Sequence, residues 1–162
     1  MEKEFIELIN KHQGILYKIC SIYFYRNPYK EDYYQEMLFR LWKSYPSYKG
    51  LSSFSTWLYR VALNTAIDII RKQTIQPKFI ELSNNEFNIP VNNQYNESDR
   101  KDKLYQAIDQ LSEVEKAIII LHLEEYDYKE ISEIMGISES NTGVKINRIK
   151  SQLIKLFENE QK

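Results

Sequence analysis

The fold of this chain is limited most by apolar residues that recur at helical spacing with little to interrupt them. In FSTWLYRVALNTAIDIIRK, residues 54–72, one side of a helix of about 3.6 residues per turn carries four of them, Phe54, Leu58, Val61 and Ile69, with Thr65 in the same stripe. Four Gly and four Pro are spread over 162 residues, and no segment alternates apolar and polar residues for long enough to predict a sheet. We therefore expect an all-α protein.

The same patterns divide the chain into two small helical domains. We expect helices over 5–25, weakened at Gly14, over 31–45 and over 54–72, and later over 103–111, 113–124, 128–135 and 139–157. Between the two groups, residues 73–101 are rich in Asn, contain Pro77 and Pro90 and follow no clear period. The domains are accordingly predicted at 1–74 and 102–162, with a flexible linker at 75–101.

Several function classes are disfavoured by composition. Cys20 is the single cysteine, which excludes an intrachain disulfide or a cysteine metal cluster, and His12 and His122 have no carboxylate at ligand spacing. The longest apolar run, 117–121, is too short to cross a bilayer, and the charged start MEKEF is followed by no apolar run. We expect a cytoplasmic protein that is not an enzyme, with no catalytic residue, metal or cofactor and no membrane insertion.

The net charge of −1 conceals an uneven distribution of charged residues. Residues 1–72 hold 11 Lys and Arg against 7 Asp and Glu, whereas residues 101–162 hold 9 against 12. Within that acidic part, 142–155 still carries Lys145, Arg148, Lys150 and Lys155 with no acid. Local fields decide binding, so two separate basic patches remain possible sites for nucleic acid.

A helix-turn-helix is predicted by YKEISEIMGISESNTGVKINRIKSQLIKL, residues 128–156. Ile131 and Met135 point inward from a short helix, Gly136 supplies the turn, and Ser138 caps a longer helix. Small Ser132 allows the two helices to approach each other.

The outward side of the longer helix carries residues suited to a DNA groove. Asn and Arg pair with base edges, Val contacts a thymine methyl, and lysines on the flanks reach phosphates. The predicted DNA-binding residues are Ser140, Asn141, Val144, Lys145, Asn147, Arg148 and Lys150, with Ser151 on the same side. Acidic residues precede this helix, so we expect the domain alone to bind DNA weakly.

Opposite its apolar side, the helix at 54–72 carries a nearly straight polar row. Arg60, Asn64 and Arg71 form this row, with Trp57 at its edge and Asp68 nearby. A polar row of this kind either faces solvent or holds a partner. The residues alone leave both interpretations open.

Three stretches, in this order, resemble signatures of bacterial sigma factors of the sigma-70 family, in the small extracytoplasmic-function (ECF) group that has two conserved helical domains. The stretches are EDYYQEMLFRLWKSY, SSFSTWLYRVALNTAIDIIRK and LSEVEKAIIILHLEEYDYKEISEIMGIS. The resemblance covers nearly the whole chain. It implies a protein that binds core RNA polymerase, directs it to promoters and helps to open the duplex.

The resemblance also implies roles for the first domain. The helix at 31–45 is the expected contact with the clamp helices of the largest polymerase subunit, through Asp32, Gln35, Glu36, Phe39 and Arg40. By angular count we expect this helix to bury Tyr34, Leu38, Leu41, Trp42 and Tyr45. The unpaired strand of the minus-ten element is expected to meet Tyr48, Lys49, Trp57, Arg60, Asn64 and Arg71.

The loop at 45–53 typically forms a pocket for a flipped base in this group, although a plain connector is the alternative. The second domain is expected to read the minus-thirty-five duplex, and the family implies an anti-sigma factor as a further partner. Two residues depart from the family: Gly143 stands where many relatives have lysine, and Thr142 where they have valine. These departures weaken the helix start and put one DNA contact in question.

Other functions remain open. A helix-turn-helix regulator that is not a polymerase subunit would need neither the polar row nor the acidic helix at 31–45. A protein-interaction module would account for an exposed Phe39 but leave the helix-turn-helix without a use. An enzyme is disfavoured because the chain has no phosphate-binding glycine loop and no metal-ligand spacing.

Overall fold

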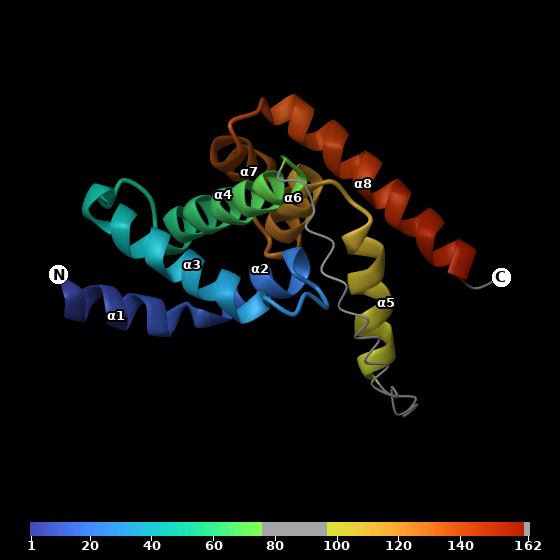
Figure 1. Cartoon of the computed structure of the whole chain (residues 1–162). Helices are drawn as coiled ribbons and strands as arrows, with labels where there is room; N and C mark the ends of the chain where they lie inside the picture. The colour runs from blue at the N-terminus through green and yellow to red at the C-terminus, as the bar shows by residue number, and fades with distance from the viewer. Residues whose placement is uncertain (76–96, 161–162) are drawn as a thin grey trace.

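A computed structural model describes residues 1–75 and 97–160 and confirms the all-α prediction (Figure 1). No strand occurs within those residues. The helices are α1 (Glu2–Lys11), α2 (Gln13–Tyr23), α3 (Lys30–Ser44), α4 (Phe54–Ile75), α5 (Glu97–Asp109), α6 (Glu113–Leu123), α7 (Tyr128–Met135) and α8 (Glu139–Glu160), with a 3-10 turn η1 at Tyr45–Ser47. The predicted linker lies mostly outside the described residues, and α5 begins at Glu97, within the segment assigned to it.

The first predicted helix is two helices that meet at His12. His12 leaves the helical region with φ −116° and ψ 17°, while its ring nitrogen Nδ1 lies 2.8 Å from the carbonyl of Leu8. The break was predicted at Gly14, but the structure has it two residues earlier, at His12. The His12 ring also packs on Phe54 with centroids 5.2 Å apart, so a tertiary contact accompanies the break.

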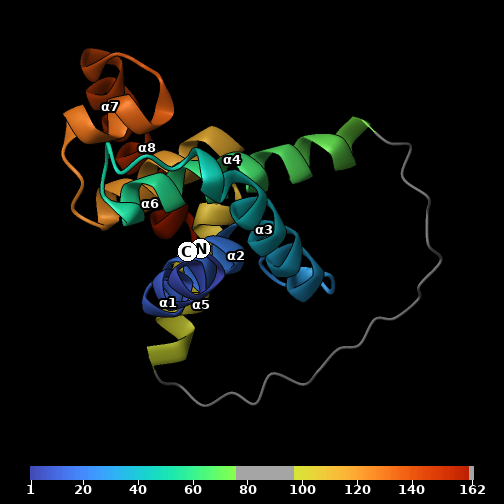
Figure 2. The same cartoon turned by 90° about the vertical axis from the view of Figure 1, so that its left-hand side faces the viewer.

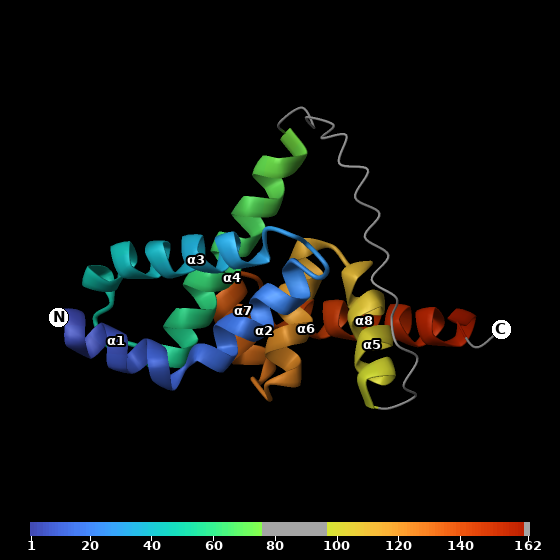
Figure 3. The same cartoon turned by 60° about the horizontal axis from the view of Figure 1, so that its bottom comes forward.

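Helices α2, α3 and α4 form the core of the first domain, and α1 runs alongside α3 (Figure 3). Leu16, Met37, Leu41 and Leu58 are fully buried at its centre. The predicted apolar stripe of α4 is buried except at Val61, which is half-buried.

The predicted buried face of α3 is partly wrong. Leu41 and Tyr45 are buried and Tyr34 and Leu38 half-buried, but Trp42 keeps 40% of its surface exposed. The side of α3 that meets α2 and α4 centres on Met37 and Leu41, which turns Trp42 toward α1. There its ring packs on Phe5 with centroids 5.1 Å apart.

Helix ends in the second domain follow their capping residues. Ser112 and Asp127 each form a capping box at the starts of α6 and α7, accepting from the amides of Glu115 and Glu130. Each box satisfies amides that a helix start otherwise leaves unpaired. The caps thus fix where α6 and α7 begin.

The two domains pack against each other through α2 and α4 on one side and α5, α6 and α7 on the other (Figures 1 and 2). The Tyr23 hydroxyl donates to the carbonyl of Glu113 at 2.6 Å, and the Tyr25 hydroxyl donates to Asp102 at 3.2 Å. Lys18 forms an ion pair with Glu124. The closed arrangement was not predicted, because separate amphipathic helices carry no signal for how two finished domains meet.

Across the described residues, no helix is both long enough and apolar enough to span a membrane.

Candidate nucleic-acid and polymerase interfaces

The turn between α7 and α8 has the geometry that the sequence predicted. Gly136 ends α7 in the left-handed conformation with φ +69°, which glycine adopts without a side-chain clash. Ser138 Oγ then accepts from the amide of Asn141 at 3.0 Å and caps α8. Thr142 is fully buried, and its hydroxyl donates to the carbonyl of Ser138 at 2.9 Å, so it contributes to the helix start.

Helix α8 lies along the outer edge of the molecule (Figures 1 and 3). Its inner side packs on α5, α6 and α7 through buried Thr142, Ile146 and Ile149. The predicted DNA-binding residues Ser140, Asn141, Val144, Asn147, Arg148 and Lys150 are exposed and Lys145 is half-exposed. The structure thus brings the whole predicted set to one accessible side and its flanks.

The polar row of α4 also lies on one side of its helix. Arg60, Asn64, Asp68 and Arg71 are exposed, and Trp57 is half-buried at the end of the row near the loop. Asp68 would oppose a nucleic-acid phosphate, but Arg40 of α3 lies 3.3 Å from its carboxylate. Arg40 also pairs with Glu36, so its single charge balances the Asp68 carboxylate only in part, and Asp68 still weakens the positive field of the row.

Two arginines of the row contact the second domain. The Arg60 guanidinium Nη2 donates to the carbonyl of Glu133 in α7 at 3.2 Å. Arg71 Nε lies 3.8 Å from a carboxylate oxygen of Glu113 in α6. In the closed arrangement, part of the row that the sequence assigned to DNA therefore faces protein.

The loop before α4 packs on an aromatic cluster formed by Tyr45, Tyr48, Phe54 and Trp57. Tyr48 and Trp57 have ring centroids 5.3 Å apart, and the Tyr48 hydroxyl donates to the carbonyl of Ser52 at 2.9 Å. Lys49 is exposed. The structure therefore brings Tyr48 to Trp57 and extends the row of α4 with aromatic surface.

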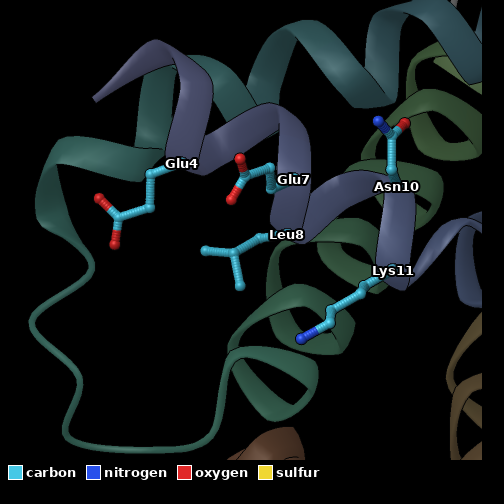
Figure 4. A pocket seen from close by; sticks show the side chains of 5 residues that line it. All are labelled: Glu4, Glu7, Leu8, Asn10 and Lys11. Carbon is cyan, nitrogen blue, oxygen red and sulfur yellow. The ribbon is translucent and has the colours of Figure 1, made fainter.

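An open cavity of about 530 Å³ lies along α1, opposite this loop (Figure 4). It is lined by Glu4, Glu7, Leu8, Asn10 and Lys11. Sequence reasoning gave these residues no role, since α1 showed only an ordinary amphipathic pattern. Two of its carboxylates would repel phosphate, so this cavity is a poor place for a nucleotide backbone.

Helix α3 presents its predicted polymerase contacts unequally. Asp32, Gln35 and Phe39 are exposed, with Phe39 at 55% and Lys43 Nζ 5.3 Å from its ring centroid. Glu36 and Arg40 are half-buried and form an ion pair at 3.0 Å, which Arg40 extends to Asp68. Arg40 therefore links α3 to Asp68 of α4, and Glu36 holds Arg40 in place, so neither side chain extends freely into solvent.

Beside Phe39 an apolar groove of about 430 Å³ runs between α1 and α3. Phe5, Ile6, Ile9, Leu38, Phe39 and Trp42 supply its apolar lining. Ile6 and Trp42 were missed by sequence reasoning. The exposed Ile6 between buried Phe5 and Ile9 was the available signal, since it widens the apolar face beyond a single core stripe.

Within the part of the chain that the structure describes, the side chains able to hold a metal ion or to react include those of His, Cys, Asp and Glu. No group of three His, Cys, Asp or Glu there could hold a metal ion. Burial raises the pKa of the Cys20 thiol to about 11, which keeps it protonated and unreactive. Burial, followed by the charge of Lys150, lowers the pKa of His122.

Comparison with known proteins finds two family matches along the chain. Residues 8–75 match the family described as Sigma-70 region 2, and residues 101–153 match Sigma-70, region 4. The ECF RNA polymerase sigma-E factor of Haemophilus influenzae is 27% identical over 94% of this chain and 86% of its own length. RNA polymerase sigma factor SigS of Staphylococcus aureus is 32% identical over 85% of this chain and 88% of its own.

Two solved structures share the fold. The sigma factor RpoE from Bartonella quintana, in complex with the anti-sigma factor NepR, superposes with a TM-score of 0.71 at 16% identity, covering 96% of this chain and 98% of that chain. CnrH, in complex with the cytosolic domain of CnrY, superposes with a TM-score of 0.67 at 15% identity over 98% and 90% of the two chains. These two structures show the fold, and the sequence matches show that the chain belongs to the sigma-70 family of RNA polymerase sigma factors, in the ECF group.

Proposed function

We propose that this protein binds core RNA polymerase and directs it to promoters, where it takes part in opening the duplex. The observation that carries this proposal is the pair of separate polar surfaces, one on α4 and one on α8. Two nucleic-acid surfaces on two domains suit a protein that engages two promoter elements. The family to which the chain belongs supports the same function.

The first domain holds the unpaired strand of the minus-ten element. Trp57 and Tyr48 offer ring surface for stacking, Arg60 and Arg71 offer guanidinium groups for phosphates, and Asn64 reads a base edge. Stacking a base on a protein aromatic returns about 1 to 3 kcal/mol, and unstacking it costs a few kcal/mol. The two terms are comparable, so strand capture depends on the polymerase as well.

The polymerase contact is made by α3. Phe39 is the apolar anchor, with Asp32 and Gln35 around it, and the clamp helices of the largest subunit are the expected partner. Glu36 and Arg40 remain in the proposed contact at its edge. Their larger effect comes from fixing α3 relative to α4 through Asp68.

Full engagement of promoter DNA requires the two domains to separate. Arg60 and Arg71 contact Glu133 and Glu113 in the closed form, so the row of α4 meets a strand only after these contacts break. Both contacts are exposed and polar, and exposed ion pairs contribute little free energy. We expect binding to core polymerase to supply the driving force for this separation.

The closed form and the net charge of −1 together predict weak DNA binding by the free protein. Non-specific DNA affinity comes mainly from phosphate neutralisation, which is small here. Attachment to polymerase raises the effective concentration of both domains at the promoter, so weak contacts act together. Tight, salt-resistant binding of promoter duplex by the free protein would contradict this.

A transcription assay with purified core polymerase tests the proposal. Promoters are first mapped by sequencing transcripts after overexpression, and permanganate reactivity of unpaired thymines then reports opening. We expect the variant Trp57→Ala/Arg60→Ala/Asn64→Ala to form holoenzyme but lose opening. The matched control Lys103→Ala/Gln110→Ala changes exposed residues of α5 and its end, and should behave as wild type.

The alternative is a helix-turn-helix regulator that is not a polymerase subunit, and α8 alone would serve it. No holoenzyme on size exclusion and no run-off transcript would favour that alternative.

As a transcription factor without catalytic activity the protein acts in the cytoplasm. An anti-sigma factor is its proposed inhibitor, since the similar sigma factor RpoE was solved in complex with the anti-sigma factor NepR.

A further inference from the structure

Gly143 lies inside α8 at a position whose backbone does not require glycine. Among the described glycines only Gly50 and Gly136 have positive φ. An interior glycine lowers helix stability relative to alanine, because it loses more backbone freedom on folding. Some feature other than backbone conformation must therefore favour glycine here.

That feature is the ring of Tyr128, the first residue of α7. A Cβ added to Gly143 would lie 3.3 Å from Tyr128 Cε2, which is closer than most Cβ contacts, and 3.6 Å from Cδ2, an ordinary contact distance. Cε2 is bonded to the carbon that bears the hydroxyl, so the hydroxyl end of the ring lies beside α8. The absent side chain at 143 thus leaves room for the tyrosine.

The hydroxyl of Tyr128 has no evident task within the protein. Tyr128 keeps 38% of its surface exposed, and its hydroxyl donates to no other group of the described residues. Its ring meets His122 only loosely, with centroids 6.4 Å apart. A tyrosine that served packing alone would need the ring but not the hydroxyl.

The ring lies on a flank of the polar face of α8. Residue 143 is about 100° around the helix from Val144, at the centre of that face, and within about 20° of Lys150. An α-helix is roughly 10–12 Å across, and the major groove is about 12 Å wide. A flank of an inserted helix therefore meets the phosphates that wall the groove.

We propose that Tyr128 donates a hydrogen bond from its hydroxyl to a phosphate of the minus-thirty-five duplex, beside the phosphate contact of Lys150. Gly143 is the positioning residue, because its lack of a side chain lets the ring reach that flank. Phosphate is an ordinary acceptor for tyrosine hydroxyls in DNA complexes. The inference rests on the proposed duplex binding by α8 and adds a residue that the recognition-helix pattern does not include.

The test measures the affinity of holoenzyme for a mapped promoter over a range of salt concentrations. Tyr128→Phe keeps the ring and removes the hydroxyl, and we expect a loss of about three- to ten-fold, a usual range for one such hydrogen bond. The loss is the same for altered minus-thirty-five sequences, and the salt slope is unchanged. Lys150→Gln lowers the affinity and also the slope by about 0.9, since one fewer counterion is released.

Gly143→Ala supplies the second variant. It should weaken promoter binding while the melting temperature of the free protein stays equal or rises, because alanine favours the helix. In the Tyr128→Phe background it should cause no further loss, since the displaced ring has no hydroxyl. A purely structural role for either residue would move melting temperature and affinity together.

Wild-type affinity in Tyr128→Phe overturns the inference, as does a Gly143→Ala loss of equal size in both backgrounds. Arg148→Ala separates this failure from that of the proposed function. If Arg148→Ala weakens binding and Tyr128→Phe does not, α8 binds the duplex and only the tyrosine contact is wrong. If neither variant changes binding, both proposals fail.

Discussion

Removing the hydroxyl of Tyr23 should shift the closed protein toward the open form. Tyr23 is buried, and its hydroxyl donates across the domain boundary to the carbonyl of Glu113 at 2.6 Å. Tyr23→Phe keeps the ring, including its contact with the Lys116 ammonium 5.7 Å from the ring centroid. The variant therefore removes one interdomain hydrogen bond and leaves the apolar packing in place.

The expected size follows from the bond that is lost. A neutral hydrogen bond contributes a net ~1 kcal/mol, and the carbonyl of Glu113 regains water when the domains part. The ratio of open to closed protein should then rise about five-fold. The free protein should bind a single-stranded minus-ten oligonucleotide more tightly by up to the same factor, because more of it exposes Arg60 and Arg71.

Two dyes, one on α1 and one on α8, report the distance between the domains by energy transfer. Tyr17→Phe is the matched control, since Tyr17 packs on Tyr34 within the first domain with ring centroids 4.9 Å apart. Equal transfer in Tyr23→Phe and Tyr17→Phe, at equal oligonucleotide affinity, would refute the argument that this contact holds the domains together. A lower melting temperature without a change in transfer would refute it as well.

Three further predictions concern single residues. Phe39→Ala should weaken the complex with core polymerase by about 2 kcal/mol, as loss of an interface anchor does, without lowering the melting temperature, and Lys103→Ala serves as its control on size exclusion. Gly136→Ala should lower the free energy of unfolding in urea by about 1 kcal/mol, because φ is +69° there, and an unchanged midpoint would contradict that reason. The depressed pKa of His122 means that the unfolded chain binds the proton more readily, so stability should fall as pH drops below about 6.5; His122→Gln should flatten that part of a urea-stability profile.

The sequence predicted what depends on neighbours along the chain. The helix-turn-helix geometry followed from Gly136 and Ser138, because the left-handed turn and the cap are local requirements. The exposed sides of α4 and α8 followed from angular position alone, and so did the burial of Leu58 and Ile146. These are properties of one helix, which its own period determines.

Contacts between side chains of different helices could not be predicted in the same way. Trp42 was predicted to be buried, because no pattern in 31–45 shows that α1 will lie alongside this helix and that Phe5 will pack on the Trp42 ring. The second ion pair of Arg40 was not predicted, because Asp68 lies 28 residues later on another helix. Gly143 was predicted to weaken a DNA contact. In the structure it lies against the ring of Tyr128, fifteen residues earlier in the chain, and a side chain at position 143 would crowd that ring.

Features of the domain interface indicate that the free energy favouring the closed form is small. Tyr59 packs edge-on against Tyr126 across it with centroids 5.6 Å apart, yet the Tyr59 hydroxyl is buried with no hydrogen-bond partner among the described residues. A buried hydroxyl without a partner costs about 1 to 3 kcal/mol, and opening returns it to water. Glu124, Glu125 and Glu130 of the second domain line the adjoining cavity of about 300 Å³. The contacts of Tyr23, Lys18 and Arg60 are therefore partly offset at the same surface, which leaves a closed form that binding to polymerase can overcome.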